Sequence, residues 1–342
     1  MTNNYPANVR KYFWFFKIKC VLLKKNKMII KKYFSMIKFA HTIFALPFAM
    51  VGFCLGVADS MDNGELRIEN GEWVGNILNS QFSILNFLLV ILCMVFARNA
   101  AMGFNRYADR FIDAKNPRTE KREIPAGSIK PRSALIFVIV NAVAFVVTCW
   151  FINDLVFYLS PVALLVILGY SLTKKYTALC HFVLGAGLSL APIGAYLAVT
   201  GKFALLPVMF SFVVFFWTAG FDIIYALQDK DFDIKERLYS IPALLGIRKA
   251  MLVSAAAHIV VGILVVITGV VWSATPSLSG RGGEGYFGIW YTIGALIFLF
   301  LLLYQHLIVK PNDLSRINAA FFTSNGIASV LYSTFTIIDM FM

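Results

Sequence analysis

Nine apolar segments, each close to the 20 residues that a helix needs to cross a lipid bilayer, follow one another along the chain. Hydrophobic residues make up 59% of the sequence and charged residues only 14%, which excludes a soluble domain of 342 residues. The sequence therefore predicts an all-α fold, a polytopic membrane bundle of nine transmembrane helices. The expected spans are 38–58, 82–104, 133–151, 156–173, 178–199, 204–227, 250–272, 288–309 and 317–338.

The positions of Lys and Arg predict which ends of these spans face the cytoplasm. If the N-terminus is cytoplasmic, the inside segments hold 27 of the 31 Lys and Arg residues. The outside segments hold only Arg67, Lys202 and Arg281, and Arg98 lies within the second span. Nine spans with a cytoplasmic N-terminus therefore fit the charge distribution. The inside segments are 1–38, 105–132, 173–177, 228–249 and 310–316.

The formal charge of +13 follows from these loops, so it indicates contact with anionic lipid rather than with nucleic acid. Residues 1–38 carry ten Lys or Arg and no acid, and no small-x-small cleavage site follows the first apolar run. We therefore interpret 1–29 as a basic cytoplasmic tail and not as a signal peptide. Met28 is an alternative start, which would make 1–29 a mis-called extension of a membrane domain at 30–342.

Two acidic clusters end two of the spans on the predicted cytoplasmic side. Asn105, Asp109 and Asp113 follow the second span, and Asp229 and Asp233 follow the sixth. Each cluster contains Asp-x-x-x-Asp, which on a helix places two carboxylates one turn apart on one face. Such carboxylates repel each other unless a cation lies between them, and carboxylate and amide oxygens suit Mg²⁺. The pattern predicts a magnesium-bound polyanion held between two helix ends.

Basic residues accompany the acids, and guanidinium and ammonium groups bind phosphate oxygens. Mixed acid and base at one membrane face indicates metal plus phosphate, whereas a purely basic face would indicate lipid headgroups. The cations are Arg110, Lys115, Arg118, Lys121 and Arg122 after the first cluster, with Lys174 and Lys175 in another inside turn.

A solvated acidic loop would explain one such motif but is a poor explanation for two copies at helix ends. Asp222 lies inside the sixth span, where an ionisable group is costly and usually functional. The isolated His41, His181, His258 and His306 are interpreted as packing or interface residues.

At this point the motifs resemble those of the UbiA superfamily of intramembrane aromatic prenyltransferases. Asn105-x-x-x-Asp109-x-x-x-Asp113, followed by Lys115-Asn-Pro-Arg-Thr119 and Arg122-Glu-Ile-Pro-Ala-Gly127, resembles the first signature of that family. Asp222-x-x-Tyr225-Ala-x-x-Asp229-x-x-x-Asp233, followed by Ser240-Ile-Pro242, resembles the second. Tyr170-Ser-Leu-Thr-Lys174 is similar to its Tyr-x-x-x-Lys element, and the resemblance runs from about residue 30 onward.

The resemblance implies a bundle around a central cavity, in the bacterial inner membrane, with its active site facing the cytoplasm. It implies that Mg²⁺ and a polyprenyl diphosphate are held by Asn105, Asp109, Asp113, Asp229 and Asp233, the four carboxylates being catalytic. Arg118, Arg122 and Lys174 become candidate diphosphate contacts, and Tyr170, Asp222 and Tyr225 would line the site.

The implied reaction transfers the polyprenyl group to a hydroxylated aromatic acid in respiratory-quinone synthesis. We favour 4-hydroxybenzoate as the acceptor, with a dihydroxynaphthoate of menaquinone synthesis as the alternative. Two departures from the family pattern matter: Arg106 replaces an Asp common in the family, which removes one possible acid. The first span bears on the choice of acceptor, because it carries Lys38 and His41 where 4-hydroxybenzoate users carry an Arg near Asp-Arg-Pro. A cation or phosphate transporter is the alternative from another class, but its acids would lie near the bilayer midplane.

Overall fold

A computed structural model describes residues 32–37, 44–62, 67–69, 72–74, 84–273 and 288–342. The predictions for the tail 1–29, for Met28, and for Lys38 and His41 fall outside these residues. A short helical turn at 32–36 precedes the first long helix.

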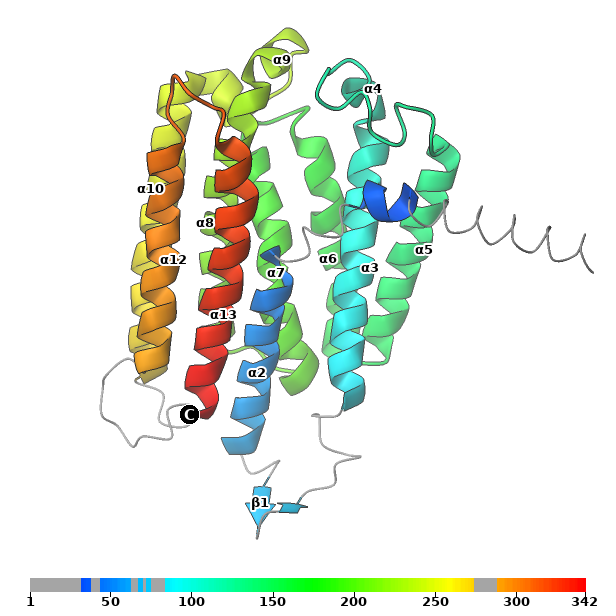
Figure 1. Cartoon of the computed structure of the whole chain (residues 1–342). Coiled ribbons are helices and arrows are strands. Elements are labelled where there is room, and N and C mark those ends of the chain that lie inside the picture. The colour runs from blue at the N-terminus through cyan, green and yellow to red at the C-terminus, as the bar shows by residue number, and fades with distance from the viewer. Residues whose placement is uncertain (1–31, 38–43, 63–66, 70–71, 75–83, 274–287) are drawn as a thin grey trace, which may run out of the picture.

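Almost all of the described chain is helical, as the apolar segments predict. Eight of the helices in the described residues are long and apolar enough to cross a membrane, and α2 is a shorter apolar helix of 17 residues that runs alongside them (Figure 1). Among the described residues, the only strands are β1 (Arg67–Glu69) and β2 (Glu72–Val74), an antiparallel pair. The helices are α2 (Leu46–Asp62), α3 (Ile84–Ala108), α4 (Arg110–Asp113), α5 (Pro131–Trp150), α6 (Asp154–Thr173), α7 (Cys180–Thr200), α8 (Leu205–Ala226), η2 (Leu227–Asp229), α9 (Lys230–Lys235), α10 (Ile241–Ser273), α12 (Ile289–Ile308), η3 (Ala319–Ser324) and α13 (Asn325–Phe341).

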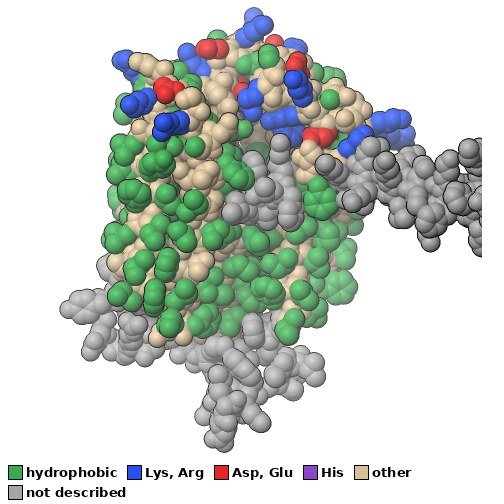
Figure 2. Space-filling model, viewed as in Figure 1, with side chains coloured by type: hydrophobic (Ala, Val, Ile, Leu, Met, Phe, Trp, Pro, Cys, Tyr) green, Lys and Arg blue, Asp and Glu red, His purple; other side chains and the backbone are tan. Residues whose placement is uncertain are grey.

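The long helices stand side by side in one bundle. Helix α7 packs against α2, α6 and α8, α10 packs against α8 and α12, and α3 packs against α5 and α6. The short helices α4 and α9 lie at one end of the bundle, and β1 and the C-terminus lie at the other (Figure 1). Figure 2 shows charged side chains gathered at the α4–α9 end above a broad hydrophobic band. Outward side chains such as Leu165 and Leu252 are 74% and 69% exposed, as expected of a surface that faces lipid.

An aromatic core fills one side of the bundle. Trp217 is fully buried, and its ring packs against Phe48 and Phe298 with centroids 5.3 and 5.8 Å apart. The indole Nε1 donates a 2.9 Å hydrogen bond to the side chain of Asn325, and Gln305 donates a second one of 2.8 Å. These buried polar groups satisfy one another, which a membrane interior requires.

The last span begins with a π-helical turn, η3. The Asn325 amide donates to the carbonyls of Ala320 and Phe321, at 3.1 and 2.9 Å, so its side chain satisfies backbone groups inside the irregular turn. Phe321 lies over the ring of Tyr225 with centroids 4.1 Å apart. The turn therefore connects the aromatic core to a predicted site residue.

Helix α10 begins nine residues earlier than the predicted span at 250. Its first turn, starting at Ile241, is separated from the rest by a kink at Gly246, whose φ of 77° favours glycine. The charged pair Arg248 and Lys249 interrupts the apolar run but not the helix. A hydropathy pattern therefore cannot detect this first turn, which lies beside the acidic cluster.

Candidate active site

Both acidic clusters lie at the same end of the bundle, and in each the long helix breaks at the first Asp. Helix α3 ends at Ala108, and Asp109 precedes the short helix α4, which ends at Asp113. Likewise α8 passes into the 3₁₀ turn η2, which ends at Asp229, and α9 carries Asp233. The two Asp residues of each cluster therefore lie on either side of a helix break rather than on one continuous helix.

In the first cluster, the acids pair with an amide and a guanidinium. Asn105 Nδ2 donates to Asp109 Oδ2 at 3.1 Å, and Arg122 Nη1 lies 2.7 Å from Asp113 Oδ1. Asp113 is 5% exposed, and its other oxygen, Oδ2, is buried without a hydrogen-bond partner. Burial, together with the negative charge of Asp113, raises the pKa of Asp109 to about 6 although nearby cations oppose the shift.

In the second cluster, Asp229 receives a guanidinium fork from the loop that follows the first cluster. Arg118 donates to its two oxygens from Nε at 2.9 Å and from Nη2 at 2.6 Å. Arg118 Nη1 also donates to the Tyr225 hydroxyl at 3.3 Å, and Asn116 Nδ2 donates to Asp229 at 3.3 Å. These contacts join clusters that lie more than 100 positions apart in the sequence into one polar site.

Asp233 is the most deeply buried carboxylate of the site, with 0% of its side chain exposed. Lys174 Nζ, just beyond the end of α6, lies 2.7 Å from Asp233 Oδ1. Ser240 donates a 2.8 Å hydrogen bond to Asp233 Oδ2 and accepts one from the backbone N–H of Ala243 in the first turn of α10. The first turn of α10 therefore fixes Ser240, and through it the carboxylate of Asp233.

Two predicted lining residues lie away from these pairs. Tyr170 is in the last turn of α6, four residues before Lys174 and hence one turn below it. Asp222 is in α8 and pairs with His181, a residue that the sequence did not mark as functional. The sequence also did not predict that Asn116 donates a hydrogen bond to Asp229. A signal was present, because Asn116 lies inside the Lys115–Thr119 segment of the first signature.

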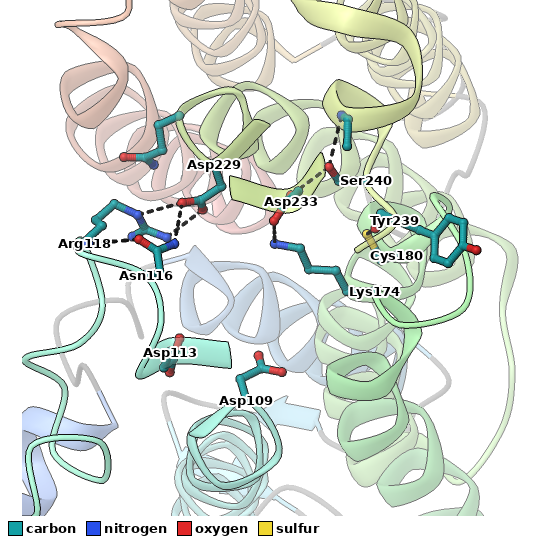
Figure 3. A network of polar contacts seen from close by, with 12 residues as sticks. Asp109, Asp113, Asn116, Arg118, Lys174, Cys180, Asp229, Asp233, Tyr239 and Ser240 are labelled. Carbon is teal, nitrogen blue, oxygen red and sulfur yellow. Dashed lines mark hydrogen bonds and ion pairs between the residues drawn. The ribbon is translucent and has the colours of Figure 1, made fainter. Parts of the chain in front are cut away.

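The donor set is chemically suited to magnesium, although the carboxylates are distributed among ion pairs. Among the described residues, no three Asp, Glu, His or Cys side chains gather closely enough to hold a metal ion. The buried Oδ2 of Asp113, which has no hydrogen-bond partner, and the amide oxygen of Asn105 in the same cluster are nonetheless hard oxygen donors of the kind that magnesium prefers. Figure 3 shows the carboxylates of the two clusters on opposite sides of the site, with Lys174 and Arg118 reaching toward the second cluster. Arrangement and donor chemistry fit a cation bound together with an anion.

A membrane bundle with two acidic clusters and interleaved cations at one end has the features of an integral membrane prenyltransferase. The model of the UbiA prenyltransferase family matches residues 77–326. The chain therefore belongs to the UbiA prenyltransferase family.

Relatives of known name agree with this assignment. The 4-hydroxybenzoate octaprenyltransferase of Vesicomyosocius okutanii is 28% identical over 263 residues, which are 76% of this chain and 90% of that protein. The 4-hydroxybenzoate octaprenyltransferase of Aeromonas salmonicida is 29% identical over 247 residues, covering 72% and 80% of the two chains.

Solved structures share the fold. A UbiA homolog from Aeropyrum pernix matches with a TM-score of 0.69 and 28% identity, over 88% of this chain and 98% of that one. A UbiA homolog from Archaeoglobus fulgidus, bound to GPP and Mg²⁺, matches with a TM-score of 0.63 and 20% identity, over 91% and 100%.

Proposed function

We propose that this prenyltransferase uses Mg²⁺ to transfer a polyprenyl group from a polyprenyl diphosphate to 4-hydroxybenzoate, in respiratory-quinone synthesis. The observation that carries the proposal is the double hydrogen bond from Arg118 to Asp229, because it joins both acidic clusters and their cations in one site. The names of the bacterial relatives support the acceptor. The diphosphate and Mg²⁺ bound to the Archaeoglobus homolog support the donor and the metal.

The metal ligands of the proposal are the hard oxygen donors of the two clusters: Asn105, Asp109, Asp113, Asp229 and Asp233. When bound, magnesium neutralises charge on the diphosphate and so makes it a better leaving group. The carboxylates would exchange their ion-pair partners for the metal.

The cations released in that exchange are the proposed diphosphate ligands. Arg118, Arg122 and Lys174 each contact a site carboxylate at 2.6 to 2.7 Å. Diphosphate oxygens can replace these carboxylates as hydrogen-bond acceptors for the three cations, and the metal would replace the cations beside the carboxylates. Each charged group would therefore keep a neighbour of opposite charge. In the transition state these cations stabilise the negative charge that develops as the allylic C–O bond breaks.

The apolar interior of the bundle would meet the remaining requirements of the reaction. An allylic cation must be kept from water, and Tyr225, packed against Phe321, presents an aromatic surface beside Arg118. Tyr170 and Asp222 lie deeper on α6 and α8 and would face the acceptor. The Lys- and Arg-rich end would face the cytoplasm of a bacterial inner membrane.

Purified protein in lipid nanodiscs, supplied with Mg²⁺ and a polyprenyl diphosphate, tests the proposal with an acceptor panel. Diphosphate release and a prenylated product with 4-hydroxybenzoate are expected. Product only with a dihydroxynaphthoate would reassign the acceptor, and no product with any aromatic acid would overturn the proposed function. Diphosphate- or cation-driven flux across proteoliposomes without product would favour the transporter.

A further inference from the structure

Asp222 is an ionisable residue two helical turns deeper than the metal-binding end of α8. It precedes Asp229 by seven residues, four of them in α8 and three in the 3₁₀ turn η2, which places it about 12 Å deeper along the axis. Its side chain is 23% exposed. A carboxylate at this depth in a membrane helix is costly and is usually kept for function.

His181 holds this carboxylate from the neighbouring helix. His181 Nδ1 lies 2.7 Å from Asp222 Oδ2, and the imidazole is 3% exposed. The backbone N–H of Ile241 approaches Nε2 on the other side of the ring, at 3.4 Å. Since an acceptor at Nε2 requires the proton on Nδ1, the two contacts together assign Nδ1–H as the donor to Asp222.

The helix packing leaves His181 little freedom to turn away. One turn along α7, a Cβ on Gly185 would lie 2.4 Å from the backbone oxygen of Phe215, so only glycine allows α7 and α8 to approach this closely. Phe215 is seven residues before Asp222 on α8, on the same face. The close approach sets the distance at which His181 meets Asp222.

The same imidazole contacts the turn that orders the second acidic cluster. Ile241, whose N–H approaches His181, directly follows Ser240, and Ser240 donates to Asp233. His181 therefore touches both the carboxylate that is deep in α8 and the segment that fixes the carboxylate at the diphosphate end.

We infer that Asp222 accepts the proton that the aromatic acceptor loses, and that His181 is the positioning residue that aims it; this rests on the proposed function. The allylic C–O bond breaks and its electron pair leaves with diphosphate. The ring carbon beside the hydroxyl group gives a π pair to the new C–C bond. The C–H pair at that carbon then returns to the ring, and the proton moves to a carboxylate oxygen of Asp222. The Nδ1–H of His181 keeps the other oxygen in place throughout.

A carboxylate at this depth gives the ring proton an acceptor within the largely apolar bundle. An ordered carboxylate of this kind contributes about 10²- to 10⁴-fold to a proton transfer. A pair that served only to pack α7 against α8 would instead affect stability and leave the order of the chemical steps unchanged. The kinetic isotope effect of a ring-deuterated acceptor separates these two roles.

The experiment compares wild type with Asp222→Asn, His181→Phe and His181→Gln in nanodiscs, using Mg²⁺, a polyprenyl diphosphate and 4-hydroxybenzoate with and without ring deuterium. His181→Phe removes both contacts of the ring, whereas the glutamine amide has a donor and an acceptor and keeps their chemistry. His306→Phe, at a histidine of α12 that contacts His258 and not Asp222, is the matched control.

Asp222→Asn should lower kcat by about 10²- to 10⁴-fold. His181→Phe should lower kcat by about 10- to 100-fold, as loss of an orienting partner does elsewhere, with KM for the prenyl diphosphate little changed. His181→Phe should also show a primary isotope effect that wild type and His306→Phe lack, and His181→Gln should recover part of kcat.

Wild-type kcat in a folded His181→Phe, or a loss of kcat without any isotope effect, would overturn the inference. If His181→Phe fails to fold, the isotope effect of His181→Gln decides in the same way. Absence of turnover in wild type would instead overturn the proposed function, so the two failures are distinguishable.

Discussion

Replacing Arg118 by Lys tests the proposed diphosphate contact, because the change removes the guanidinium fork and keeps the positive charge. Arg118 donates two parallel hydrogen bonds to Asp229, of 2.9 and 2.6 Å. Diphosphate offers a fork the same paired oxygens, whereas an ammonium group binds as a point charge. Losing one charge-assisted hydrogen bond costs about 1.5–3 kcal/mol. That loss corresponds to a roughly 10- to 150-fold lower kcat/KM for the prenyl diphosphate.

The assay is diphosphate release by nanodisc-reconstituted protein at saturating acceptor and magnesium, with the prenyl diphosphate varied. Arg132→Lys is the matched control, because it also replaces a guanidinium by an ammonium group. Arg132 is exposed in the first turn of α5 and contacts no carboxylate of the site. The control should keep the wild-type kcat/KM. A wild-type kcat/KM for Arg118→Lys itself would refute the fork as a diphosphate ligand.

Three further predictions concern the acidic clusters and their metal. Asp109→Asn and Asp229→Asn should each abolish measurable diphosphate release while the protein still unfolds in one cooperative thermal transition. A variant that keeps normal turnover would show that the replaced residue is not a metal ligand. Chelation with EDTA should stop turnover and added Mg²⁺ should restore it, so activity that survives chelation would contradict a metal requirement. Lys174→Met should destabilise the protein by about 3 kcal/mol in detergent unfolding, because the fully buried Asp233 loses its partner. Adding Asp233→Asn to Lys174→Met should recover much of that stability but not the activity. A destabilisation of under about 1 kcal/mol in Lys174→Met alone would contradict the prediction, because that is the value of a solvent-exposed ion pair.

The apolar length of a span predicts its interior better than its ends. The sixth span was expected at 204–227 and α8 runs over Leu205–Ala226, because both ends of that apolar run coincide with the ends of the helix. Helix α10 was expected from 250 and begins at Ile241. Hydropathy measures the cost of placing side chains in lipid, and the charged pair Arg248 and Lys249 therefore ends the predicted span. The helical turn at Ile241 lies beyond that pair and beyond the kink at Gly246.

The local part of the site was also accessible from sequence, and the pairing across the fold was not. The Asp-x-x-x-Asp spacing survives the helix break, since the backbone N–H of Asp113 still donates to the carbonyl of Asp109 at 2.7 Å. By contrast, Arg118 pairs with an acid 111 positions away, and no periodicity connects the two. His181 was interpreted as a packing residue for the same reason, because its partner lies 41 positions away on another helix.

The π-helical turn at the start of the last span has a consequence for how that helix tolerates changes in length. A π turn holds one residue more than an α-helix of the same path. Deleting one residue within Ala319–Ser324 would let an α-helix run through with both sides in place, whereas winding all of these residues as an α-helix would rotate one side against the other by about 100°. Either Phe321 would then lose the Tyr225 ring, or Asn325 would lose Trp217. Phe321 is thus in register with the site and Asn325 with the aromatic core. The π turn is the irregularity that allows both contacts to form in one helix.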